Sequence, residues 1–252
     1  MSKEKLLSIF TLPVLWLIYF IFETVTGRVD NITIILWNIV LIFIFALIGY
    51  LFYKLKENYK KLSSKYLIIL SCILLMVDQG IKIIIKFFFF NKDITLIKNF
   101  LSFTPIINTD GSWINARYNA NISFSLLIIF NILAILIFIE LYRYLLKKSP
   151  NNFWFDFCFV FILCGAICSL IDKLFYGGSL DFIGIGNLFI ADFKDIYIDL
   201  GILFFVLFLY SDDSLISDDT SSLKDDLKHL KSFIVFIKND ILSIFSATDV
   251  QR

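Results

Sequence analysis

Residues 153–173 read FWFDFCFVFILCGAICSLIDK, a long apolar stretch that closes on an Asp-Lys pair. A helix rises about 1.5 Å per residue and the hydrocarbon layer of a membrane is about 30 Å thick, so about 20 apolar residues can cross it. Charged side chains interrupt this stretch only near its ends, at Asp156 and at Asp172 with Lys173. We interpret it as a transmembrane helix that brings charged groups to one membrane surface, with Asp156 as an interfacial or packing residue.

The composition of the whole chain places its other apolar stretches in a membrane as well. Of 252 residues, 59% are hydrophobic and 18% are charged, whereas a soluble domain is about half apolar and about a quarter charged. The formal net charge of +1 argues against a nucleic-acid partner attracted by charge. A single His and few Cys argue against a His/Cys metal cluster, and no cofactor is expected. The cysteines lie in apolar runs and are interpreted as packing residues: Cys72, Cys158, Cys164 and Cys168.

Six stretches are apolar and long enough to be predicted as membrane-spanning helices. They lie near residues 6–22, 33–53, 66–88, 122–146, 153–172 and 196–210, the last being the shortest. The first stretch could be a signal peptide, since Lys3 and Lys5 precede it. We favour a retained helix because no clear small-x-small cleavage site follows. The sequence therefore predicts an all-α, multi-pass integral membrane protein.

The distribution of positive charge predicts the orientation of these helices, because cytoplasmic loops carry an excess of Lys and Arg. Lysines precede the first span and crowd the loop after the second, and Arg143 with Lys147 and Lys148 follows the fourth. This bias predicts that both termini are cytoplasmic. The connections that would face outward are 23–32, 89–121 and 173–195.

The C-terminal part of the chain has a different composition. Residues 211–222 are rich in Asp, Ser and Thr, which is typical of a solvated linker. Leu and Ile then recur at intervals of four and three residues over 223–244, as in a heptad stripe. A coiled coil or a helix on the inner leaflet would bury this stripe, so the segment is a candidate surface for a partner. His229 is interpreted as a solvated helix position.

Charged residues within apolar stretches are costly in a membrane and are therefore candidates for function. Asp78 and Lys82 are four residues apart on one helical face and can form an ion pair, although a purely structural pair fits equally well. A richer group of carboxylates surrounds the last outward connection: Asp172, Asp181, Asp192, Asp195 and Asp199.

Two carboxylates held close together can cleave an amide without a metal or a covalent intermediate. Because both cannot ionise cheaply, one stays protonated while the other accepts a proton from water. The ionised member acts as general base on the attacking water, and the neutral member polarises the scissile carbonyl. Such a pair titrates as a unit.

Four blocks of the sequence resemble those of lipoprotein signal peptidase (signal peptidase II), a bacterial membrane aspartyl peptidase. The first two are Asp78-Gln79 with Lys82, similar to the family's D-Q-x-x-K, and Asn108-Thr109-Asp110-Gly111, which resembles its N-x-G block with one extra residue. The third runs from Gly165 to Asp172-Lys173 and is similar to G-x-x-x-N-x-x-D-R, with Asp181-Phe182-Ile183 following as x-D-F-I. In the fourth, Asp195 with Ile198 and Gly201 fits A-D-x-x-I-x-x-G.

This resemblance implies a four-helix membrane core at residues 64–212. Two extra transmembrane helices and a basic loop would precede it at 1–63, and an acidic linker with a cytoplasmic heptad helix would follow at 213–252. It implies that Asp181 and Asp195 are the catalytic pair. The residues that it implies as supporting or substrate-binding are Asp78, Lys82, Asn108, Ser169, Asp172, Lys173 and Asp192.

The sequence departs from the family pattern near the implied site. Ser169 stands for the family Asn, Lys173 for the Arg, and Asp192 and Lys194 for an Asn and a small residue. Replacing Arg by Lys keeps the charge but loses a planar two-pronged donor. Asp192 or Asp199 could be the second acid instead of Asp195, which the spacing to Ile198 and Gly201 favours.

The resemblance implies an aspartyl endopeptidase of the bacterial cell membrane that removes signal peptides from diacylglyceryl-modified prolipoproteins. Its partners would be the lipidated substrate and membrane lipids, and its active site would face outward. Three alternatives remain open at this point: an inactive paralogue that binds lipidated peptides, a small transporter or channel, and a scaffold that assembles through the 223–244 stripe.

Overall fold

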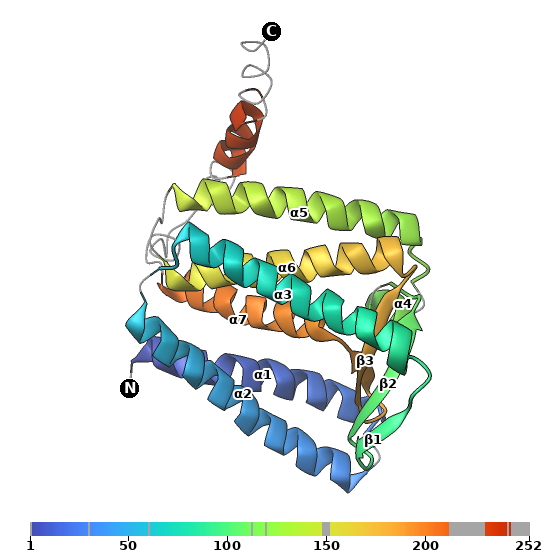
Figure 1. Cartoon of the computed structure of the whole chain (residues 1–252). Coiled ribbons are helices and arrows are strands. Elements are labelled where there is room, and N and C mark those ends of the chain that lie inside the picture. Colours follow the sequence, from blue (N-terminus) through green and yellow to red (C-terminus); the bar gives the residue numbers. More distant parts are fainter. Residues whose placement is uncertain are drawn as a thin grey trace.

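The protein is described by a computed structural model, which covers residues 2–29, 31–59, 61–111, 113–118, 120–147, 152–211, 230–240 and 242. Long helices lie side by side, and a small sheet with a short helix covers one end of the bundle (Figure 1). The long helices are α1 (Lys3–Val25), α2 (Ile32–Asn58), α3 (Ser64–Ile84), α5 (Phe124–Leu146), α6 (Phe153–Phe175) and α7 (Phe193–Ser211). A π-helical turn, η1 (Ile85–Phe89), extends α3.

Five of these helices are long and apolar enough to cross a membrane among the described residues: α1, α2, α3 with η1, α5 and α6. The sixth expected span corresponds to α7, a helix of 19 residues whose first turn carries Lys194 and Asp195. Large apolar side chains stay exposed along these helices, as on Phe43 of α2 and Ile137 of α5. Such faces suit contact with lipid, and the predicted all-α membrane fold is confirmed.

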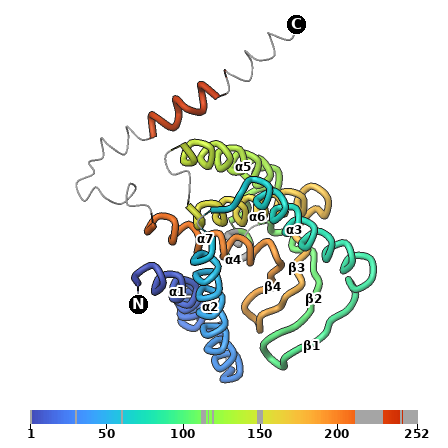
Figure 2. The backbone as a smooth tube through the Cα atoms, turned by 60° about the vertical axis from the view of Figure 1, so that its left-hand side comes forward, coloured from blue at the N-terminus to red at the C-terminus, as the bar shows by residue number. Residues whose placement is uncertain are grey.

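A four-stranded antiparallel sheet, which the sequence did not predict, lies in the two long connections at 89–121 and 173–195. Its strands are β1 (Ile94–Ile97), β2 (Leu101–Asn108), β3 (Ser179–Ile185) and β4 (Phe189–Ala191), in the order β1-β2-β3-β4. The helix α4 (Trp113–Tyr118) follows β2. Figure 2 shows the strands as one layer beside the ends of the helices. The pairing of β2 with β3 joins the two connections and sets Ile106 opposite Asp181.

The helices α6 and α7 form the centre of the bundle, and two glycines let them approach closely. A Cβ added at Gly165 would lie 2.7 Å from the Ile198 side chain and 3.2 Å from the backbone oxygen of Lys194. A Cβ added at Gly201 would lie 2.4 Å from the Ile162 side chain. This contact fixes the start of α7, and hence Asp195, against α6.

Replacing Gly165 by Ala should therefore destabilise the protein, even though Ala is the better helix former. We expect a loss of about 1–3 kcal/mol, the usual cost of overpacking, measured by thermal unfolding in detergent. Gly80→Ala in α3 is the matched control, because a Cβ added there meets nothing within 4 Å. Equal stability of the two variants would contradict the proposed close approach of α6 and α7.

Only part of the C-terminal segment lies within the described residues. Residues 230–240 are helical, and this helix contacts the end of α5, where Arg143 forms an ion pair with Asp240 and Tyr144 packs on Phe233 and Phe236. The acidic linker, His229 and most of the predicted heptad positions lie outside the described residues.

Candidate active site

The candidate site lies at the sheet end of the bundle and draws on five elements. The strand β3 carries Asp181, and the short hairpin from β3 through β4 leads to Asp192 and into α7 with Asp195. The other predicted residues at this end come from α3 (Asp78 and Lys82), β2 (Asn108) and α6 (Asp172). The site therefore depends on both the helix bundle and the pairing of β2 with β3.

The structure brings together Asp181 and Asp195, the two carboxylates that the family resemblance implies as a pair. One carboxylate oxygen from each of Asp181, Asp192 and Asp195 lies within 4.8 Å of the other two. Asp181 is buried, with 3% of its surface exposed, whereas the side chain of Asp195 is 45% exposed. The pair thus has a closed side at Asp181 and an open side at Asp195, where a substrate can approach.

Asp181 is held by donors on three sides. The Ser179 hydroxyl donates to its Oδ1 at 2.5 Å, and the Asn108 amide donates to its Oδ2 at 3.0 Å. The Lys194 ammonium lies 3.4 Å from Oδ1. Burial raises the pKa of Asp181 above its usual range, while Lys194 and the hydrogen bonds from Ser179 and Asn108 oppose that shift. These donors all favour the ionised carboxylate.

Asp192 and Asp195 form a reciprocal cap at the start of α7. The backbone N–H of Asp195 donates to Asp192 Oδ1 at 3.2 Å, and the N–H of Asp192 donates to Asp195 Oδ2 at 3.1 Å. This is the geometry of a capping box, with aspartates in the two positions. The cap holds the Asp195 carboxylate beside the end of β4, so Asp192 orients Asp195 as well as ending the hairpin.

Lys82 is fully buried and joins carboxylates from α3, from α6 and from the link between β4 and α7. Its Nζ lies 3.0 Å from Asp78, 2.6 Å from Asp172 and 2.6 Å from Asp192. The Gln79 amide also donates to Asp78 at 2.9 Å and to Asp172 at 3.1 Å. Burial alone would raise the pKa of Asp192, but the ammonium groups of Lys194 and Lys82 outweigh it and hold that pKa below its usual range.

Lys194, which stands for a small residue of the family pattern, points into the group of carboxylates. Its Nζ lies 2.6 Å from Asp192, 3.4 Å from Asp181 and 3.8 Å from Asp195. These three carboxylates are close enough to hold a metal ion, but the ammonium already supplies a positive charge among them. The donor set therefore fits an internal lysine better than a divalent cation.

Sequence reasoning missed Ser179, whose hydroxyl lies between Lys194 Nζ and Asp181 Oδ1 at 2.5 Å from each. Ser179 precedes Asp181 by two residues on β3, and the alternation of a strand places both on one face. A serine beside a lysine can form a nucleophilic pair, but only if the amine is neutral. The carboxylates around Lys194 stabilise its charged form, so the geometry favours Ser179 as a hydrogen-bond donor.

The remaining predicted residues lie at the edge of this group or outside it. Lys173 donates to the Ser169 hydroxyl at 2.5 Å along its own helix, so these two substituted positions bind each other. Asp199 is exposed on α7 and does not belong to the group around Asp181. Asp156 lies at the other end of α6, where it accepts hydrogen bonds from the Leu62 backbone and the Tyr142 hydroxyl.

Comparisons with solved structures show the same fold in bacterial membrane enzymes. One such enzyme, solved by the in meso method at 2.3 Å, matches with a TM-score of 0.51 at 20% identity, covering 65% of this chain and 98% of the other. A second, at 1.9 Å, matches with a TM-score of 0.50 at 21% identity, covering 61% of this chain and 98% of the other. At these identities the likeness concerns the fold.

Sequence comparison adds the family. A search of curated proteins gave no match to the chain. The family model described as signal peptidase (SPase) II matches residues 70–211, which run from α3 to the end of α7 and contain every charged residue of the site. Because this match spans more than half of the chain, the protein belongs to the signal peptidase II family.

Proposed function

We propose that the protein is an aspartyl endopeptidase that removes signal peptides from diacylglyceryl-modified prolipoproteins. The observation that carries this proposal is the meeting of Asp181 and Asp195, from a strand and a helix, with oxygens no more than 4.8 Å apart. Family membership supports a peptidase that acts in lipoprotein processing. The geometry supplies the two acids that such a reaction needs.

The surroundings of the two carboxylates suggest which one acts as the general base and which one carries the proton. Asp181 accepts hydrogen bonds from Ser179 and Asn108, so it keeps the negative charge and acts as general base on a water molecule. Asp195 faces the open side and carries the shared proton toward the scissile carbonyl. As the tetrahedral intermediate collapses, the proton taken from water passes to the leaving amine. The pair titrates as a unit throughout.

The surface around the open side suits a substrate that stays in the membrane. On α7, Ile196 and Ile202 are exposed, and on η1 Phe87 and Phe88 are exposed. A signal helix and two acyl chains could remain in lipid beside these residues while the peptide bond reaches Asp195. Lys3, Lys54 and Arg143 lie at the helix ends that are remote from the site. Because positive charge favours the cytoplasmic side, both termini would be cytoplasmic and the site would face outward in a bacterial cell membrane.

The direct test is cleavage of a diacylated prolipoprotein by the purified protein, with and without globomycin, an inhibitor of this family. We expect cleavage just before the lipidated cysteine and its loss with the inhibitor. Binding of the lipopeptide without any cleavage would instead identify an inactive paralogue. Ion flux in proteoliposomes without cleavage would identify a transporter or channel.

Deletion of residues 213–252 should leave cleavage by the membrane core nearly unchanged. The site residues lie between Asp78 and Asp195, and the described part of the tail contacts α5 at the other end of the bundle through Arg143. We expect kcat/KM within about 3-fold of the full chain, since removing a remote contact leaves transition-state binding intact. Complete loss of cleavage would favour a scaffold that works through the 223–244 stripe.

A further inference from the structure

The helices α1 and α2 precede the segment matched by the family, yet they contact the hairpin that connects the two candidate catalytic residues. Between Asp181 and Asp195 the chain forms β3, a tight turn and β4. Arg28, in the link between α1 and α2, donates to the backbone oxygens of Asn187 at 2.8 Å and Leu188 at 2.5 Å. The Asn187 amide donates back to the Arg28 oxygen at 3.0 Å. Arg28 and the turn of the hairpin thus each donate hydrogen bonds to the other.

A buried carboxylate at the end of α1 holds this arginine. Glu23 is fully buried and accepts from Arg28 at 3.1 Å. Arg117 of α4 approaches the same Glu23 oxygen at 3.7 Å and donates to the Thr26 hydroxyl at 3.1 Å. The corner between α1 and α2 therefore links the β3–β4 turn with α4, the helix that follows Asn108.

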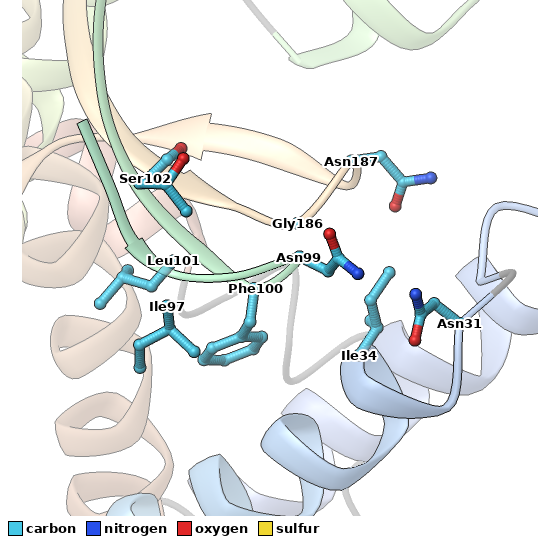
Figure 3. Close-up of a pocket in the computed structure, with 10 residues that line it drawn as sticks. Asn31, Ile34, Ile97, Asn99, Phe100, Leu101, Ser102, Gly186 and Asn187 are labelled. Carbon is cyan, nitrogen blue, oxygen red and sulfur yellow. The ribbon is translucent and has the colours of Figure 1, made fainter. Parts of the chain in front are cut away.

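Aromatic contacts bind β4 and β2 to the same two helices. Phe189 of β4 packs against Trp16 at 6.1 Å and Tyr19 at 5.7 Å between ring centroids. Trp37 of α2 stacks on Phe100, next to β2, at 5.5 Å. Next to these contacts, a pocket of about 360 Å³ lies between the start of α2 and the two turns that join β1 to β2 and β3 to β4. Asn31, Asn99 and Asn187 line this pocket (Figure 3). Beside that pocket, the polar contacts of Arg28 fix the β3–β4 turn.

From these contacts we infer that the helical pair α1–α2 is a positioning module for the active site, with Arg28 and Glu23 as positioning residues. The module holds the β3–β4 turn and α4, and through them it sets Asp181 opposite Asp195. This inference rests on the proposed function for its effect on catalysis, while the anchoring itself is a structural claim. Small displacements of catalytic groups are costly, so loosening the turn should slow the chemical step.

The test compares two single variants of the full chain in lipid nanodiscs. Arg28→Ala removes the contacts to Glu23, Asn187 and Leu188. Glu57→Gln is the matched control, because Glu57 forms an exposed ion pair with Lys54 at 2.7 Å at the other end of the same helical pair. Arg28→Lys keeps the charge but carries its donors on a single nitrogen instead of a planar fork that reaches three acceptors, and should fall between the wild type and Arg28→Ala.

Two readouts separate positioning from general stability. With a diacylated prolipoprotein, Arg28→Ala should lower kcat about 10-fold or more and change KM by less than about 2-fold. Hydrogen–deuterium exchange of residues 186–191 should become at least about 5-fold faster while that of α5 stays unchanged. Glu57→Gln should change neither readout.

Each outcome decides the inference. Slower turnover together with faster exchange of 186–191 supports it. Unchanged exchange in Arg28→Ala overturns the anchoring, and faster exchange with wild-type kcat overturns the link to catalysis. If the wild-type protein does not cleave the substrate, the proposed function fails, and the exchange of 186–191 alone then decides the anchoring: faster exchange supports it, and unchanged exchange overturns it.

Discussion

Asp181→Asn is expected to lower the rate of prolipoprotein cleavage by about 10³-fold or more, the range that general acid–base catalysis supplies. Asn cannot accept a proton from water, and its amide would face the donors of Ser179, Asn108 and Lys194, which lie within 3.4 Å of the native carboxylate. Asp195→Asn should have an effect of similar size, because a pair that shares one proton needs both members. The measurement is single-turnover cleavage by protein purified in detergent or nanodiscs.

The control for this experiment is Asp199→Asn, since Asp199 is exposed on the same helix as Asp195 but lies outside the group of carboxylates. It makes the same chemical change one helical turn away and should alter the rate by less than about 3-fold. A large loss in Asp199→Asn with a small loss in Asp195→Asn would reassign the second acid. Thermal unfolding of each variant shows whether the fold survives, because Asp195 also caps α7.

The helices and the pairing of the two acids could be anticipated from particular residues. The length of apolar runs such as 153–173 predicts spanning helices because the bilayer sets a minimum length. Asp195, Ile198 and Gly201 are spaced three residues apart, which places them near one another on the surface of a helix. In the structure, Ile198 and Gly201 lie at the contact of α7 with α6. The expectation that Asp181 and Asp195 meet came from the resemblance of their motifs to those of signal peptidase II, and the two carboxylates do lie close together.

The sheet and the anchoring by α1 and α2 could not be anticipated in this way. The strands β1 and β4 have only four and three residues. The longer strands β2 and β3 pair across a separation of more than 70 residues, as in the contact of Asn108 with Asp181. The spacing of apolar residues within either segment does not predict that the two segments pair. In the sequence, Arg28 is an isolated charge between two apolar stretches, although in the structure it binds the turn at Asn187. The role of Arg28 depends on the contact between the α1–α2 link and the β3–β4 turn. The order of these segments along the chain does not predict that contact.

The lysine at position 194 changes the charge balance of the proposed pair. An ammonium within 3.4 Å of Asp181 and 3.8 Å of Asp195 stabilises both ionised carboxylates. The proposed reaction needs one of them protonated, so Lys194 reduces the fraction of protein in the competent state at neutral pH. Burial of Asp181 works in the other direction and raises its pKa. The pH dependence of cleavage should therefore report the balance of these two effects.

Lys194→Met should move the whole pH–rate profile upward by about one pH unit or more, as loss of a nearby opposite charge does. Without the ammonium, the last proton leaves the pair at higher pH, so activity persists further into the alkaline range. The first carboxylate also protonates at higher pH, so activity falls earlier on the acidic side. Lys86→Met is the control, because Lys86 lies over the Tyr176 ring at 4.6 Å and should leave the profile in place. An unshifted profile in Lys194→Met, with cleavage retained, would show that the ammonium does not govern the protonation of Asp181 and Asp195.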